Sequence, residues 1–266
     1  PFATIEPNTG IVPVPDERLN VLAKMYHAEK ITPATVTFVD IAGLVAGASK
    51  GEGLGNKFLA NIRQCDAIVH IVRAFESDDI VHVENIIDPK RDIDTINTEL
   101  ILADLQTLET RLTRLAKEAK ANPKASAIKN RLEVLAEKLR AGTPINEISG
   151  VDPDDIADLP LLTAKPVIYV FNVNEETLAS EDKKQSLRNL VPHARSLFIC
   201  AKLEDEIKGL NPSDTLELLQ SYDVPEAGLT QMIRAAYDLL GLQSYLTTGP
   251  KEVRAWTIHQ GWTAPQ

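Results

Sequence analysis

Short, continuous apolar runs recur along the chain and predict buried β-strands. Strands buried on both faces are apolar throughout, whereas half-exposed strands alternate between apolar and polar residues. The runs cover residues 35–41, 67–75, 166–171 and 196–200. Residues 16–26 before the first run and residues 56–64 after it have helical spacing. Apolar strands separated by helices indicate a largely parallel sheet of the α/β class.

The middle of the chain has a different periodicity. Leucine and isoleucine recur at spacings of three and four on both sides of Asn122-Pro123, at Ile101, Leu105, Leu108, Leu112 and Leu115, and then at Ala125, Ile128, Leu132, Leu135 and Leu139. This pattern predicts an antiparallel helical hairpin with one narrow apolar stripe and charged flanks. Two interpretations stay open: a solvated hairpin without a binding role, and an arm that docks a partner.

The last part of the chain changes again, from a helix to a hairpin. Residues 228–242 have helical spacing, and residues 244–258 predict a β-hairpin around Gly249-Pro250. A single hairpin is marginally stable in water. We therefore interpret it as the opening of a small β-rich domain.

Composition excludes several classes of protein. The 266 residues contain 28 Lys+Arg and 38 Asp+Glu, a net charge of −10, which disfavours nonspecific binding of nucleic acid by the whole surface. Two cysteines cannot form a disulfide scaffold or a cysteine-rich zinc site. No apolar run approaches the roughly 20 residues of a membrane span, so no membrane partner is expected.

Candidate chemistry lies where the predicted strands end. Asp40 ends the first strand and Gly43 follows, as in the DxxG motif of P-loop nucleotide hydrolases. In that motif the carboxylate reaches Mg²⁺ and the glycine amide bonds the γ-phosphate. The alternative is that Asp40 is a turn or cap residue.

Two further motifs follow later strands. Residues 172–175 read Asn-Val-Asn-Glu where GTPases have N/T-K-x-D, whose aspartate accepts hydrogen bonds from guanine. Valine in place of lysine and glutamate in place of aspartate should weaken guanine selectivity, because an unmatched buried donor costs about 1–3 kcal/mol. Adenine is then a reasonable ligand. Cys200-Ala201-Lys202 stands where GTPases have S-A-K, and strand C-terminal ends are where such sheets bind ligands.

Together the motifs resemble one family, the Obg-like ATPases of the YchF subfamily, within the TRAFAC class of P-loop nucleotide hydrolases. Further segments are similar to it. Residues 1–10 resemble the switch I segment of the family and residues 40–59 resemble its glycine-rich switch II. Residues 96–100 and 251–257 are similar to two later family segments. The resemblance implies a Ras-like α/β P-loop NTPase sheet with an inserted α-helical coiled-coil hairpin and the start of a C-terminal β-rich TGS domain. The implied division is 1–95 and 161–242 for the nucleotide domain, 96–160 for the hairpin and 243–266 for the TGS domain.

The resemblance also implies an activity and a set of site residues. It implies a cytoplasmic, Mg²⁺-dependent ATPase that binds ATP in preference to GTP and associates with the ribosome, with RNA contact through the hairpin or the TGS domain. Thr4 and Asp40 would lie at the metal, and Gly43 at the γ-phosphate. Leu44 replaces the water-orienting glutamine of many GTPases, so hydrolysis should be slow. The base would be contacted by Asn172, Val173, Glu175, Cys200, Ala201 and Lys202.

The phosphate-binding motif G-x-x-x-x-G-K-[ST] does not occur in these residues. In the resembled family it lies just before the segment that matches Pro1, so we expect this chain to be part of a longer protein. Two alternatives remain: an Obg-type GTPase, and a binding module regulated by nucleotide with incidental hydrolysis.

Overall fold

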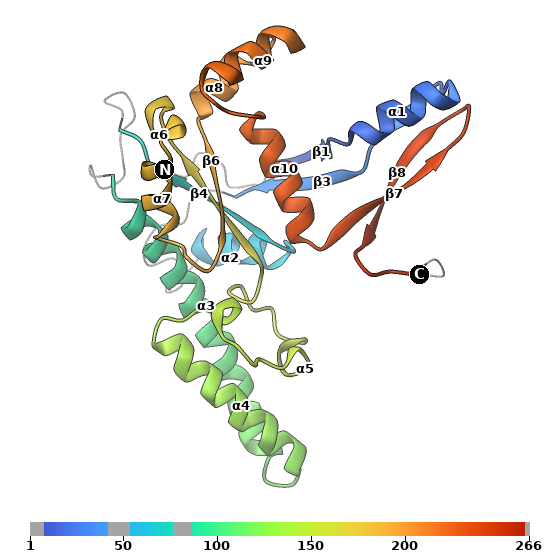
Figure 1. Cartoon of the computed structure of the whole chain (residues 1–266). Coiled ribbons are helices and arrows are strands. Elements are labelled where there is room, and N and C mark those ends of the chain that lie inside the picture. The colour runs from blue at the N-terminus through green and yellow to red at the C-terminus, as the bar shows by residue number, and fades with distance from the viewer. Residues whose placement is uncertain (1–7, 42–53, 77–86, 264–266) are drawn as a thin grey trace. The chain divides into compact units, whose positions relative to one another are not determined.

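The computed structural model describes residues 8–41, 54–76 and 87–263 (Figure 1). The chain divides into two compact units. In the described ranges, one comprises residues 41, 54–68 and 88–166, and the other comprises 8–40, 69–76, 87 and 167–263. Within these ranges no helix is both long and apolar enough to cross a membrane.

Three of the four predicted core strands form a sheet in the order β4-β5-β6, whereas the strand predicted at residues 35–41 pairs antiparallel with another strand. Its strands are β4 (Ile68–Arg73), β5 (Val167–Asn172) and β6 (Arg195–Ile199). Strands β5 and β6 run parallel, with Ile168 opposite Arg195 and Asn172 opposite Ile199, which confirms the parallel pairing expected for them. Because the two strands are parallel and in register, the loops that follow them emerge at the same edge.

Helix α10 (Gly228–Leu239) packs against this sheet through Ala235, which lies in one buried cluster with Ile168 and Val170. Its first turn is fixed by Glu204, whose carboxylate accepts hydrogen bonds from the Gly228 and Leu229 amides at 2.6 and 3.2 Å. Gly228 is needed for space, since a Cβ there would lie 2.8 Å from Ile199 Cγ1. The other helices near the sheet in sequence are α6 (Glu175–Ala179), α7 (Glu181–Arg188), α8 (Ala201–Glu206) and α9 (Pro212–Ser221).

Two further sheets lie in the described part of this unit. Strands β1 (Asn8–Pro13) and β3 (Thr35–Asp40) pair antiparallel, and α1 (Glu17–Tyr26) lies between them in the chain. The predicted C-terminal hairpin is confirmed as β7 (Leu242–Thr248) and β8 (Val253–His259). The short strand β2 (Ile31–Thr32) joins it in parallel along β8, a pairing that sequence patterning did not predict because it links residues over 200 positions apart. The hairpin is thereby stabilised as part of a three-stranded sheet.

The other unit contains the predicted helical hairpin, α3 (Pro89–Glu118) and α4 (Pro123–Arg140) (Figure 1). Each helix begins with a proline preceded by an N-cap whose side chain accepts an amide hydrogen bond, Asp88 for α3 and Asn122 for α4. All ten residues of the predicted apolar stripe belong to one cluster, which confirms the hairpin. The first helix begins at Pro89, before the boundary at residue 96 that the resemblance implied.

After the hairpin the chain packs back along it. This return segment includes the 3₁₀ turn η1 (Ile145–Glu147) and α5 (Pro153–Ile156), and Ile145, Ile156 and Leu161 cover the hairpin stripe. Helix α2 (Leu54–Arg63) forms a second cluster with the base of α3, made of Leu59, Ile62, Leu100, Ala103 and Leu162. The hairpin base is therefore packed on two sides.

A buried carboxylate fixes the return segment to α3. Asp104 is 0% exposed and accepts hydrogen bonds from the Leu162 amide, the Thr163 amide and the Thr163 hydroxyl, each at 2.7 Å. The same hydroxyl accepts a hydrogen bond from the Ile145 amide at 3.2 Å. Burial raises the pKa of Asp104, opposed by these hydrogen bonds and by the charge of Arg63. The network therefore joins α3, η1 and the approach to β5.

Replacing Asp104 by alanine should lower the free energy of unfolding by about 2–4 kcal/mol, because it leaves buried donors without an acceptor. Urea denaturation of the variant measures the change. Asp94→Ala is the matched control, since Asp94 lies on the same helix with its side chain 59% exposed, and it should change stability by less than about 1 kcal/mol. Equal effects of the two substitutions would show that the Asp104 network does not hold this unit together.

Candidate functional site

The loops that follow β5 and β6 are joined directly to one another. Asn172, the last residue of β5, accepts a hydrogen bond through its Oδ1 from the Ala201 amide at 3.1 Å. The Val173 amide donates to the Ile199 carbonyl at 2.9 Å. The structure thus brings together two motifs that are almost 30 residues apart in sequence.

Asn172 also contacts the end of β4. Its carbonyl oxygen accepts a hydrogen bond from the Ala74 amide at 2.8 Å, one residue beyond β4. Its side chain and main chain therefore hold the ends of three neighbouring strands. An alanine at position 172 would keep the main-chain bond with Ala74 and lose the side-chain bond with Ala201.

A short helix presents the acidic residue of the first motif. Asn174 is the N-cap of α6, and its Oδ1 accepts from the Thr177 amide at 2.9 Å. Glu175 is consequently the first residue of α6, where a carboxylate is favoured by the helix dipole.

Glu175 forms an ion pair with the lysine of the second motif. Lys202 Nζ donates to Glu175 Oε1 at 2.7 Å, and the two side chains are 71% and 29% exposed. The hydrogen bond from Lys202 is the main reason that the pKa of Glu175 lies below its usual value, so Glu175 is ionised at neutral pH. Sequence reasoning missed this pair, although opposite charges just past two adjacent strands were a signal for it.

Two of the predicted base-contacting residues have buried side chains. Val173 is 2% exposed and Cys200 is 3% exposed. In this structure the Val173 side chain supports the loop from within, and the groups at the surface are those of Glu175, Ala201 and Lys202. Burial also raises the pKa of the Cys200 thiol, which keeps it protonated.

The predicted metal and phosphate residues lie mostly beyond what the structure describes. Asp40 is the exposed last residue of β3, opposite Asn8, whereas Thr4, Gly43 and Leu44 lie outside the described residues. In the described ranges, no three His, Cys, Asp or Glu side chains gather as a metal site. A single exposed carboxylate at a strand end nevertheless fits Mg²⁺, which is commonly held by one or two carboxylates together with substrate phosphates and water.

Comparisons with known proteins give a consistent result. A family model described as "50S ribosome-binding GTPase" matches residues 1–105. The "Ribosome-binding ATPase YchF" of Haemophilus influenzae is 49% identical over 272 residues, covering 100% of this chain and 75% of that protein. The Bacillus subtilis protein of the same name is 44% identical over 274 residues, with the same coverage.

A solved structure agrees with these sequence matches. The Schizosaccharomyces pombe YchF GTPase is 33% identical to this chain, with a TM-score of 0.84, and the match covers 100% of this chain and 74% of that one. The fold expected from the sequence, an α/β P-loop NTPase fold with a long helical hairpin, is thereby confirmed. The identities and coverage place the chain in the YchF family of P-loop nucleotide hydrolases.

Proposed function

We propose that the chain is the nucleotide-responsive part of a cytoplasmic, ribosome-binding ATPase that binds ATP with Mg²⁺ and hydrolyses it slowly. The observation that carries this proposal is the junction of the two loops after β5 and β6, in which Asn172 bonds Ala201 and Glu175 pairs with Lys202. Relatives that share 44–49% of its residues are named ribosome-binding ATPases.

The Glu175–Lys202 pair favours adenine over guanine. Guanine recognition in GTPases needs a carboxylate that accepts two hydrogen bonds from the base. One oxygen of Glu175 already accepts from Lys202, so the carboxylate is partly occupied before a base arrives. Adenine has an acceptor at N1 where guanine has a donor, so it makes no such demand on this carboxylate.

GTP is the second candidate nucleotide, on two grounds. The matching family model and the fission yeast structure are both described as GTPases. Glu175 also retains one oxygen without the Lys202 bond, through which a weaker contact with guanine could form.

The proposed hydrolytic residues come from the DxxG segment and the N-terminal segment. Asp40 and Thr4 would hold Mg²⁺, and the Gly43 amide would bond the γ-phosphate. Leu44 has no polar atom with which to orient water, so slow hydrolysis is expected unless a partner supplies that group. Rearrangement of the segments containing Thr4 and Leu44 around the γ-phosphate would then report the nucleotide state to the ribosome.

The hairpin and the C-terminal sheet are the proposed contacts with the ribosome. The α3–α4 hairpin has an apolar stripe buried within its own unit and charged side chains along its flanks, as expected of a short coiled coil. Strands β7 and β8 would belong to the TGS domain. RNA contact through either element is part of the proposal.

Base preference tests the proposed ligand. With Mg²⁺ present, ATP should compete for binding at least tenfold better than GTP, and Lys202→Ala should reduce that ratio several-fold, because it frees both oxygens of Glu175 to accept from guanine. Lys208→Ala is the matched control, because Lys208 is a nearby lysine whose side chain is 75% exposed. Competition with a fluorescent ATP analogue measures both constants. Tighter binding of GTP by the unmodified chain would favour the GTPase alternative.

The switch is tested through Asp40. Co-sedimentation with ribosomes should differ several-fold between a non-hydrolysable ATP analogue and ADP, and Asp40→Asn should abolish that difference, because the amide is a poorer Mg²⁺ ligand. Glu29→Gln, an exposed acidic residue in the same unit, should preserve the difference. Ribosome binding that is indifferent both to nucleotide and to Asp40→Asn would refute the switch and favour a binding module.

A further inference from the structure

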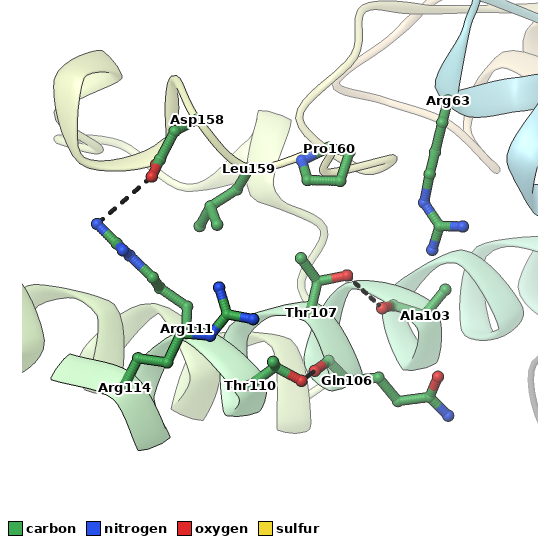
Figure 2. Close-up of a pocket in the computed structure, with 10 residues that line it drawn as sticks. All are labelled: Arg63, Ala103, Gln106, Thr107, Thr110, Arg111, Arg114, Asp158, Leu159 and Pro160. Carbon is green, nitrogen blue, oxygen red and sulfur yellow. Dashed lines mark hydrogen bonds and ion pairs between the residues drawn. The ribbon is translucent and has the colours of Figure 1, made fainter. Parts of the chain in front are cut away.

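A hollow of about 430 Å³ lies in the unit that contains the helical hairpin, and none of its lining residues belongs to the loops after β5 and β6 (Figure 2). Its floor is the middle of α3, and its walls are the end of α2 and residues 158–160 of the return segment. Its volume is within the range of ligand pockets, about 300–1,000 Å³.

Arginines dominate the lining. Arg63 is the last residue of α2, and Arg111 and Arg114 lie one helical turn apart on α3. Figure 2 shows the side chains of all three bordering the same hollow. Among the described residues that line the hollow, Asp158 is the only acidic one, so the lining has three positive side chains and one negative, although the whole chain carries −10.

The ion pair between Arg111 and Asp158 at the hollow is long and partly exposed. Arg111 Nη2 lies 3.4 Å from Asp158 Oδ2, and the aspartate side chain is 60% exposed. Exposed pairs of this kind contribute little to stability and separate readily. An incoming anion could therefore share Arg111 with Asp158.

Two buried donors at the hollow have no hydrogen-bond partner among the described residues, namely Nε of Arg63 and Nε of Arg111. Buried donors are nearly always paired in folded proteins, and an unpaired one calls for an explanation such as a bound ion, a ligand or water. Because Arg63 and Arg111 both line this hollow, a single ligand bound there would explain both unpaired donors.

The remaining polar groups do not compete with the arginines. The Thr107 hydroxyl donates to the Ala103 carbonyl at 3.1 Å, and that of Thr110 donates to the Gln106 carbonyl at 2.9 Å. Asp104 lies close enough to Arg63 for the arginine to lower its pKa, but its carboxylate is fully buried and already accepts three hydrogen bonds. The guanidinium N–H groups of the three arginines have a planar fork that matches phosphate oxygens.

We propose that this hollow binds a phosphate group through Arg63, Arg111 and Arg114. The phosphate comes either from a small phosphorylated molecule or from the backbone of an RNA strand, since both present the same tetrahedral oxygens. The site is separate from the proposed nucleotide site, because none of its residues belongs to the loops after β5 and β6. Its RNA form rests on the proposed RNA contact of the hairpin.

The test uses Arg63→Gln, Arg114→Gln and the double variant, and leaves Arg111 with Asp158. Lys117→Gln is the matched control, an exposed cation on the same helix that does not line the hollow. Pyrophosphate binding is measured by calorimetry, and binding of a single-stranded RNA 12-mer by fluorescence anisotropy at several salt concentrations. The nucleotide site is the same in all of these variants. A difference in binding between them therefore cannot come from phosphate bound at the nucleotide site.

The double variant should bind pyrophosphate, RNA or both at least tenfold more weakly, while Lys117→Gln stays within twofold of the unmodified chain. For RNA, the slope of log K against log salt should fall by about 0.7 when the one phosphate contact at this site is lost. Loss for pyrophosphate alone identifies a small ligand, and loss for RNA alone identifies a backbone phosphate. Unchanged binding of both probes overturns the proposal.

Folding and the proposed function are checked separately. Arg114 is exposed, so Arg114→Gln should unfold at the same temperature as the unmodified chain and still weaken the probe severalfold. The preference for ATP over GTP should be unchanged in every variant. If Arg114→Gln and Lys117→Gln bind the probes alike, the arginines do not form a phosphate site, whatever the outcome for ATP.

Discussion

The carboxylate of Asp104 is the constraint on which the hairpin unit depends. It is wholly buried, and it accepts three hydrogen bonds from two consecutive residues almost 60 positions later in the chain. Helix propensity and the apolar stripe can form the hairpin, but they do not determine where along α3 the return segment is attached. Asp104 fixes the return segment to α3 at Thr163, four residues before β5 begins. The cost of burying a charge, evident in the raised pKa, is offset by this set of donors.

Asn172 has a comparable role in the other unit. Its carbonyl and side-chain oxygens contact the residues just past β4 and β6, so one residue aligns the ends of three strands. Alignment is required before any ligand can be recognised there, because Glu175 and Lys202 come from different loops and meet only when β5 and β6 are in register. An asparagine suits this position because its amide oxygen accepts a hydrogen bond without introducing a charge.

Local patterns were sufficient for most of the fold. The stripe from Ile101 to Leu139, the parallel strands β5 and β6, and the hairpin around Gly249 all follow from spacing and turn residues, which depend on near neighbours. Pairings over long separations were not predictable in this way. The contact of β2 with β8, the bond from Thr163 to Asp104 and the Glu175–Lys202 pair have no periodic signal, because each depends on how finished elements come together. The motifs selected the two loops that are proposed to contact the base, but they did not predict the burial of Val173.

The local arrangement of charged side chains matters more for ligand binding than the net charge of the chain. A chain with a net charge of −10 should repel phosphates at long range, and screening limits that repulsion to about 10 Å at 0.1 M salt. Within that distance the balance of charge is set by neighbouring side chains, and the positive side chains of Arg63, Arg111 and Arg114 outnumber the acidic ones in the lining of the hollow. Lys202 is also surrounded by acidic partners, Glu175 and Glu206, so its charge is largely neutralised. The two places therefore suit different ligand groups: the loops after β5 and β6 suit an uncharged base, and the arginine-lined hollow suits an anion.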